Sequence, residues 1–393
     1  MSLVFAAMDR RRVAVSVGFL AYGAVIGSWV PRLPAIKDHL GLSDGQVGLA
    51  LVAGAVGSII GAGGARFALN RGARKWVRIG TVVLCVALLG PAAAGEFVVL
   101  LATFIALGAA AGFLDVLENA QAADLERQAH RPMINGFHGF WSLGAMLGSV
   151  AAAAAAHAGV APMIQFAFAA VLLGVASAPF LRNLPDTRGG IRNPVAGDAM
   201  RWRLGAAVGA LAAIAFCGIV VEGGGGDWSA VYLRDIAHAD PGLAATGYAG
   251  YALAMTLVRF GADRVTARTS PELVAALGGL LAAAGLAIAI ASPVVAGAVV
   301  GFTVVGAGVA VVIPLAFSAG ANLGRSATAL SLVAASSYAG SIAGPFLIGN
   351  VADRLGLRAA LAIPLIAALV IVALARSLRR VAAPVALDEA GSV

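Results

Sequence analysis

The chain contains a series of long apolar segments, and these constrain its fold more than any other feature. A helix that crosses a bilayer needs about 20 mostly apolar residues. By this measure the sequence holds twelve candidates, which cover approximately residues 13–31, 45–67, 76–95, 97–120, 135–157, 160–181, 203–222, 243–262, 272–291, 294–318, 328–350 and 358–376. Only 12% of the residues are charged and 60% are hydrophobic, whereas an ordinary soluble domain has about 25% charged residues. We therefore expect an all-α integral membrane protein with twelve transmembrane helices.

The placement of the basic residues predicts how these helices are oriented. If the N-terminus is cytoplasmic, all but five of the 27 Lys and Arg residues lie at the termini or in even-numbered connections. The five exceptions are Arg32, Lys37, Arg234, Arg354 and Arg358. Basic residues concentrate in the cytoplasmic loops of membrane proteins, so we expect both termini to be cytoplasmic. The same placement explains the net charge of +8 without a nucleic-acid partner.

A weak internal repeat relates the two halves of the chain. Trp29, His39 and Gly48 recur at one constant offset as Trp228, His238 and Gly247, and the hexapeptide RFALNR at 66–71 is similar to RFGADR at 259–264. Repeated halves of six helices, related in parallel, occur in large transporter folds. We therefore predict an N-terminal six-helix bundle at 1–181, a cytoplasmic linker at 182–202 and a C-terminal six-helix bundle with a short cytoplasmic tail at 203–393.

This organisation resembles the major facilitator superfamily over nearly the whole chain. The segment 259–264 is similar to the Asp-Arg signature that the family places after its second and eighth spans. The resemblance implies a cytoplasmic latch formed by Asp263, Arg264 and Arg259. The first-half copy at 66–71 lacks the aspartate of the signature, and its basic residues are equally well explained by topology alone.

More narrowly, the segments 112–119 (GFLDVLEN) and 138–144 (HGFWSLG) resemble the fourth and fifth spans of fucose permease and of a bacterial fucose-permease-like subgroup. Fucose permease pairs a Leu-acid-x-x-x-Asn motif in span four with an acid in span one. Leu114, Asp115 and Asn119 match this motif, whereas the first predicted span contains no acid. The resemblance implies that the substrate is a small solute, such as a sugar or a related polar metabolite.

Asp115, Glu118 and Asn119 are spaced i, i+3 and i+4, so they share one face of a helix. A carboxylate within the membrane is costly and usually faces a cavity or a partner, often in a proton relay. Our hypothesis is that Asp115 carries a coupling proton or binds substrate, with Asn119 as its hydrogen-bonding partner. The alternative is that the helix ends before these acids and leaves them at the cytoplasmic surface.

The next helix offers further candidates. Counting about 1.5 Å per residue from the turn between the two helices places Trp141 level with Glu118, and His138 one turn nearer the cytoplasm. His138 is either a proton relay or a packing histidine, and Trp141 either stacks on a ligand or packs. Tyr22, in the middle of the first predicted span, is open to the same two interpretations. Asn322, near the inner end of the tenth span, is expected to cap a loop.

The outer ends of the first and seventh spans suggest a gate. Glu222 closes the seventh predicted span and is followed by four glycines and Asp227. Because consecutive glycines are poor helix formers, we expect the helix to break here and to form a hinge. The alternative is an ordinary helix end with a solvated acid. Arg32 can pair with Arg234-Asp235 when the gate closes, or these residues form an exposed pair without function.

Several function classes lack their signatures in this sequence. The five histidines show no metal-ligand spacing, and neither a nucleotide-binding motif nor a nucleophile elbow is present. We therefore expect no enzyme activity, no cofactor and no metal.

The predicted function is secondary active transport. We expect a monomer in the inner membrane of a bacterium that moves its solute by alternating access, as a symporter driven by protons. One alternative is a proton-driven exporter of drugs or metabolites. Such exporters usually carry a Gly-Pro motif in span five, whereas here the pair Gly344-Pro345 lies in span eleven. The other is a transporter-like sensor that binds its ligand without moving it.

Overall fold

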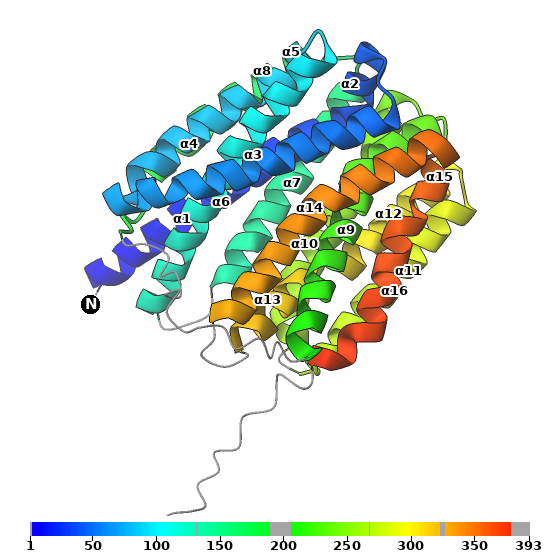
Figure 1. Ribbon diagram of the computed structural model, residues 1–393. Coiled ribbons are helices and arrows are strands. Elements are labelled where there is room, and N and C mark those ends of the chain that lie inside the picture. Colours follow the sequence, from blue (N-terminus) through cyan, green and yellow to red (C-terminus); the bar gives the residue numbers. More distant parts are fainter. Residues whose placement is uncertain (1, 130–132, 189–205, 267, 323–326, 379–393) are drawn as a thin grey trace, which may run out of the picture.

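The protein is a bundle of long helices (Figure 1). The computed structural model describes residues 2–129, 133–188, 206–266, 268–322 and 327–378, and all regular structure in these residues is helical. The first group of elements comprises α1 (Ser2–Trp29), η1 (Val30–Arg32), α2 (Leu33–Leu40), α3 (Asp44–Arg71), α4 (Ala73–Ala87), α5 (Leu89–Ala93), α6 (Phe97–Ala129), α7 (Ile134–His157) and α8 (Pro162–Leu181). The second comprises α9 (Ala206–Asp235), α10 (Pro241–Thr266), α11 (Pro271–Ala291), α12 (Val295–Val309), α13 (Val312–Asn322), α14 (Ala327–Leu355), α15 (Leu357–Ala360), α16 (Ala362–Leu374) and η2 (Ala375–Leu378).

Within the described residues, 11 helices are long and apolar enough to cross a membrane. They coincide with eleven of the twelve predicted segments. The remaining segment, 243–262, forms the 26-residue helix α10, whose apolar sequence is interrupted by side chains such as Thr246 and Arg259. A membrane span through α10 therefore stays a prediction.

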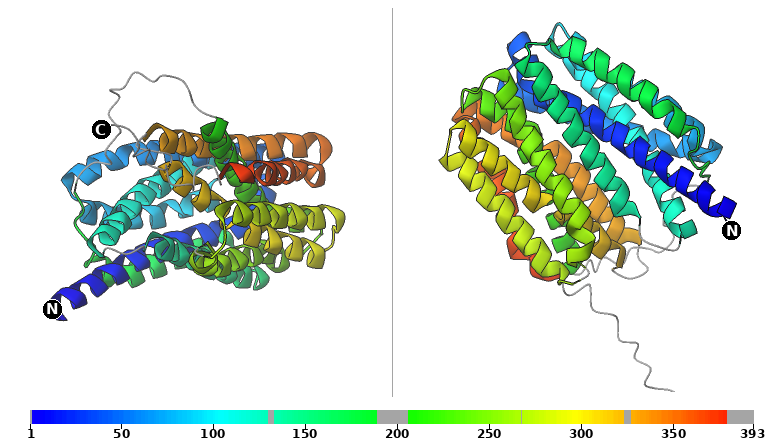
Figure 2. Two further views of the ribbon diagram at one scale, coloured as in Figure 1. Left: turned by 90° about the horizontal axis from the view of Figure 1, so that it is seen from below. Right: turned by 180° about the vertical axis from the view of Figure 1, so that it is seen from behind.

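The helices pack as two groups that meet mainly along two helix pairs. In the first group α1 packs on α7 and α3 on α6, while in the second α9 packs on α14 and α16, and α11 on α12. Between the groups, α7 packs against α10 and α3 against α14 (Figures 1 and 2). Any space enclosed between these two contacts is therefore lined by helices from both groups.

Small residues allow the helices to approach closely. A Cβ atom on Gly61 of α3 would overlap the carbonyl oxygen of Ala109, and one on Gly108 of α6 would overlap that of Gly54. Lipid provides no hydrophobic drive for helix association, so such close backbone packing contributes much of the attraction. Gly57 and Gly61 of α3 thus allow this helix to pack closely on α6.

The predicted break after Glu222 is wrong, because α9 continues through all four glycines to Asp235. The glycines fit between neighbouring helices. A Cβ on Gly224 would lie 2.8 Å from the Pro364 Cβ, and one on Gly225 would lie 2.7 Å from the Val305 Cγ1. Tight packing against α16 and α12 thus outweighs the weak helix preference of glycine.

The helix that carries Asp115, Glu118 and Asn119 is also longer than predicted. The expected end near residue 120 is not observed, since α6 continues to Ala129. Asp115, Glu118 and Asn119 therefore lie inside a continuous helix, and the interpretation that the helix ends before them is wrong.

Candidate functional site

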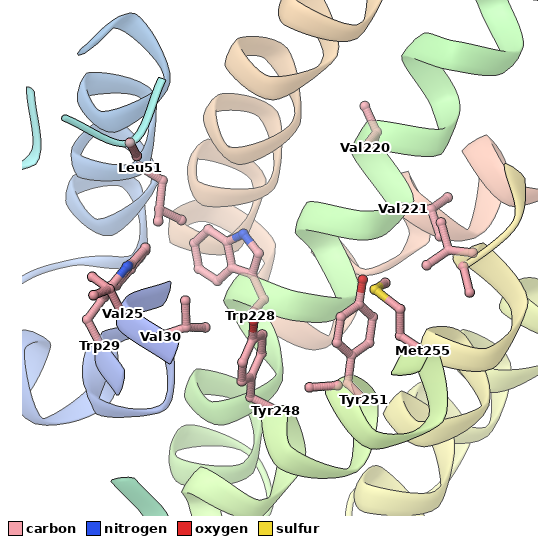
Figure 3. Packing of buried hydrophobic residues seen from close by; sticks show 14 of the residues in the cluster. Val25, Trp29, Val30, Leu51, Val220, Val221, Trp228, Tyr248, Tyr251 and Met255 are labelled. Atoms are coloured by element: carbon pink, nitrogen blue, oxygen red, sulfur yellow. The ribbon is translucent and has the colours of Figure 1, made fainter. Parts of the chain in front are cut away.

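A cavity of about 300 Å³ lies between the two helix groups. Residues of α1, α3, α6 and α7 line one side, and residues of α9, α10 and α14 line the other. Its aromatic lining consists of Tyr22, Trp29, Phe104, Trp141, Tyr248 and Tyr251. Figure 3 shows Trp29 on one side and Tyr248, Tyr251 and Met255 of α10 on the other. The cavity is thus apolar and aromatic, as ligand pockets generally are, with few polar groups.

The predicted site residues divide between this cavity and its surroundings. Those that line the cavity are Tyr22, Trp141, Glu222 and Asp227. Asp115, Glu118, Asn119 and His138 are not among its lining residues. On α6 the lining ends at Ala111, about one helical turn before Asp115.

Asp115, Glu118, Asn119 and His138 form the group that we call the α6 cluster. The side-chain nitrogen of Asn119 donates hydrogen bonds to the backbone oxygen of Asp115 at 2.8 Å and to its Oδ1 at 3.1 Å. The Oδ1 of Asn119 lies 3.2 Å from the Nε2 of His138 on α7. The predicted partnership of Asp115 and Asn119 is therefore present as a hydrogen bond within one helix turn.

Glu118 points toward α1 and does not line the cavity. Its side chain is 1% exposed, and neither carboxylate oxygen has a hydrogen-bond partner among the described residues. A Cβ on Gly18 of α1 would lie 2.8 Å from the Oε1 of Glu118, so the glycine leaves room for this side chain.

The predicted depth of the α7 residues is wrong by about one turn. His138, and not Trp141, is level with the polar face of α6, because it contacts Asn119. The prediction treated the two helices as a closely packed antiparallel pair. In the structure α6 packs mainly on α3, and α7 packs mainly on α1 and α10, so counting from the turn misplaces the register.

A second polar group, which we call the α9 cluster, consists of Glu222, Asp227 and Arg259. The Nη1 of Arg259 donates to the Oγ of Ser142 at 2.9 Å, and its Nη2 lies 3.7 Å from the Oε1 of Glu222. The Arg259 guanidinium also lies 5.9 Å from the centre of the Trp141 ring. Arg259 of α10 therefore joins the two helix groups beside the cavity.

This position separates Arg259 from the predicted cytoplasmic latch. Its side chain reaches Ser142 and Glu222, which line the cavity, so its assignment to the latch is wrong. The segment match was misleading here because Arg259 lies about one helical turn before the Asp-Arg pair. The side chains of Asp263, Arg264 and Asn322 lie outside the described residues, and the latch itself stays a prediction.

Ser142 connects the two clusters, and sequence reasoning had not given it a role. Its Oγ donates to the backbone oxygen of His138 at 3.1 Å while it accepts from Arg259. Polar contacts thus run from Asp115 to the His138 ring, and from the His138 backbone oxygen through Ser142 and Arg259 to Glu222 of the second helix group. A serine flanked by small and apolar residues gives no sequence signal for such a link.

A third set of polar contacts joins the groups at what we call the Lys37 end, the end of the bundle at which Lys37 lies. Lys37 forms ion pairs with Asp44 at 2.6 Å and with Asp235 of α9. Nearby, the Nε of Arg234 lies 3.3 Å from the Oδ2 of Asp38. The Lys37–Asp235 and Arg234–Asp38 pairs connect α2 with α9 across the boundary between the groups.

The predicted gate pair is therefore wrong in its partners. Asp235 binds Lys37, whereas Arg32 is buried and donates to the backbone oxygen of Val160 at 2.5 Å. Arg234 pairs with Asp38, and Asp227 faces the cavity. The position of Lys37, among the few basic residues of the predicted outer connections, is the signal that could have identified it.

Comparison with known families and proteins identifies the chain's relatives. The profile of the family described as Major Facilitator Superfamily matches residues 14–327. The chain is 31% identical over 347 residues to an uncharacterized transporter of Sinorhizobium fredii, covering 88% of this chain and 92% of that protein. It is 30% identical over 381 residues to an uncharacterized MFS-type transporter of Yersinia pestis, covering 94% and 96%. Membrane protein MosC of Rhizobium meliloti is 28% identical over 351 residues, covering 88% and 85%.

Solved structures share the fold. The nucleoside transporter NupG superimposes with a TM-score of 0.70 at 13% identity, covering 95% of this chain and 100% of that chain. The human organic anion transporter MFSD10 gives a TM-score of 0.66 at 16% identity, covering 94% and 99%. At these identities the likeness concerns the fold alone.

Proposed function

Because the chain belongs to the major facilitator superfamily, we propose that it is a secondary active transporter for a small polar solute, a sugar or a related metabolite. It is a multi-pass membrane transporter with bacterial relatives. In this proposal it works in the cytoplasmic membrane, by alternating access, with protons as the coupling ion. The observation that carries the proposal is the cavity between the two helix groups, which has polar side chains from both groups at its edge.

Alternating access requires contacts between the groups that form and break at opposite ends. The Lys37 end supplies one such set, since its ion pairs join α2 to α9. These side chains are partly exposed, so water can replace each partner when the pairs separate. In the proposal this end is the outer one, both termini are cytoplasmic, and Asp263 and Arg264 form the latch at the inner end.

The division of the chain follows the same logic. We assign residues 1–181 and 203–393 to the two moving bundles, α10 to the eighth of the twelve spans, and 182–202 to the cytoplasmic linker. The packing of α1 to α8 and of α9 to α16 within separate groups supports this division.

The α6 cluster is the proposed site of proton coupling. Asp115 lies about one turn from the cavity and is joined through Asn119 to His138. Ser142 then leads on to Arg259 and Glu222, so a change of charge at Asp115 has a route of polar contacts to the cavity. A carboxylate in a membrane helix is a common proton carrier, which supports this role for Asp115.

The test uses purified protein reconstituted into vesicles that contain a pH-sensitive dye. We expect an external solute from a panel of L-fucose, D-glucose, glucosamine and tyramine to acidify the lumen, and a labelled form of that solute to exchange with unlabelled solute inside. Exchange without proton movement would overturn the coupling. Binding without exchange would favour the ligand sensor, and proton movement opposite to the solute would favour the exporter.

A further inference from the structure

The charges around the cavity do not balance. Its two charged lining residues are Glu222 and Asp227, both acidic. Arg259 lies beside Glu222, with its Nη2 3.7 Å from the Oε1. In the described part of the chain, no Lys, Arg or His nitrogen forms a salt bridge with Asp227. One carboxylate is therefore left without a counterion at a partly buried site.

An unpaired carboxylate in an apolar surrounding is costly, and the cost is relieved by a cation that enters the site. Asp227 is half-buried and lies on the cavity wall, on the same face of α9 as Gly223 and Gly226. A cationic group in the cavity can therefore approach it without a conformational change of the helix.

The aromatic walls are suited to the same kind of ligand. Tyr248 and Tyr251 lie stacked, with ring centres 5.9 Å apart, next to the glycine turn that carries Asp227. Tyr22 and Trp141, both from the first helix group, pack edge to face on the other wall of the cavity, with ring centres 6.0 Å apart. Faces of Tyr and Trp attract cations, and this attraction strengthens where water is excluded.

An independent observation concerns a hydrogen-bond donor without an acceptor. Trp29 lines the cavity, is only 8% exposed, and its Nε1 has no partner among the described residues. Buried donors are nearly always satisfied by protein, water or ligand. A ligand oxygen that comes within hydrogen-bond distance of this nitrogen would supply the missing acceptor.

We propose that the cavity binds a small organic ammonium ion that also carries a hydroxyl or ether oxygen, with Asp227 as its counterion and Trp29 as the donor to its oxygen. This inference rests on the proposed function and names the substrate class of that same site. A volume of about 300 Å³ suits a compact ligand at the small end of the usual range for binding pockets.

The test compares molecules that differ only by an amine in place of a hydroxyl group. The two pairs are glucosamine with D-glucose, and tyramine with tyrosol, each titrated into purified protein by calorimetry and by thermal shift. We expect at least about tenfold tighter binding of the amine in one pair or both, which corresponds to about 1.4 kcal/mol. Asp227→Asn is expected to remove this preference, whereas Asp186→Asn, at an exposed site outside the cavity, leaves it unchanged.

A second variant keeps the proposal testable if Asp227→Asn fails to fold. Trp29→Phe retains the ring and removes the donor, and we expect it to weaken amine binding about fivefold. Equal binding within both pairs, absence of binding by either amine, or an amine preference that survives Asp227→Asn would overturn the inference. A variant that changes only the pH dependence of transport would show that Asp227 carries a proton instead.

The transport result separates this inference from the proposed function. Exchange of D-glucose without binding of either amine leaves the transporter proposal intact and overturns the substrate class. Binding of an amine without exchange supports the substrate class and overturns transport.

Discussion

The α6 cluster and the α9 cluster are both rich in acidic side chains, yet their surroundings differ. In the α6 cluster, Asp115 bonds to Asn119 and Asn119 contacts His138, so this part of the group is satisfied internally. In the α9 cluster, Glu222 and Asp227 face the cavity, and the one cation of this cluster, the Arg259 guanidinium, contacts Glu222 and also Ser142, which belongs to the first helix group. On α6, about one helical turn separates Asp115 from Ala111, the last residue that lines the cavity, so a site suited to a proton adjoins one suited to a solute.

The largest expected effect comes from removing the cation of the α9 cluster. Arg259→Gln leaves Glu222 without its partner and breaks the bond to Ser142. Breaking a largely buried ion pair by removing one partner costs about 3 kcal/mol, so we expect a clear fall in the melting temperature and loss of solute exchange. Arg259→Lys, which keeps the charge, is the matched control. An unchanged melting temperature in Arg259→Gln would contradict the buried link.

The next effect concerns the carboxylate of the α6 cluster. Asp115→Asn retains an oxygen that can accept from Asn119, so the fold is expected to survive. Loss of the proton carrier should lower proton-driven uptake at least about tenfold, equivalent to about 1.4 kcal/mol in the barrier, and flatten its pH profile. Uptake across a pH series measures both, with Asp124→Asn on the same helix as control. A wild-type profile would remove Asp115 from the mechanism.

A smaller effect is expected from a substitution at the Lys37 end. It tests whether weakening the contacts between the helix groups at this end affects the α6 cluster and the α9 cluster alike. Lys37→Gln breaks two ion pairs of a side chain that is 14% exposed, and we expect a loss of about 2 kcal/mol in stability. Solute binding at the α9 cluster should weaken, while the pH profile set by the α6 cluster keeps its shape.

The control for Lys37 is Arg127→Gln, which breaks an ion pair whose arginine is 68% exposed. We expect it to change stability by no more than about 0.5 kcal/mol. Thermal denaturation of each variant, with and without added solute, measures both its stability and its solute binding. Equal effects of the two substitutions would show that the Lys37 pairs do not hold the halves together.

The smallest effect is expected from Glu118→Gln. Because neither carboxylate oxygen has a hydrogen-bond partner, the amide loses nothing in pairing, and stability should change by less than about 1 kcal/mol. The pH profile should remain that of the wild type. If Glu118→Gln flattens the profile and Asp115→Asn does not, the two acids exchange roles in the α6 cluster.

Much of the fold could be predicted because membrane helices carry a strong local signal. Segment length and apolar content placed eleven helices, since each must span the same thickness. The glycines after Glu222 were predicted to break the helix because helix propensity depends only on the residue type. In the structure Pro364 and Val305 lie so close to α9 that only a residue without a side chain fits there. Such close packing against distant helices cannot be predicted from the local sequence of one helix.

The site was predicted less completely, for a related reason. The spacing of Asp115 and Asn119 is a property of one helix and could be read directly. The partners of Arg259 and Lys37 come from distant helices, so sequence offered candidates without their pairing. The link through Ser142 depends on how α7 crosses the boundary, which only the packing of α7 against α10 determines.

The start of α3 depends on a residue from the other helix group. Asp353 of α14 accepts from the backbone nitrogen of Gly45 at 2.8 Å and from the Oγ of Ser43 at 3.0 Å. The first amides of a helix lack partners within the helix, so one bundle completes the secondary structure of the other. When the bundles part at this end, water must take over that amide, and its proton becomes free to exchange with solvent. The Gly45 amide is therefore an intrinsic reporter whose exchange rate measures how often this end opens.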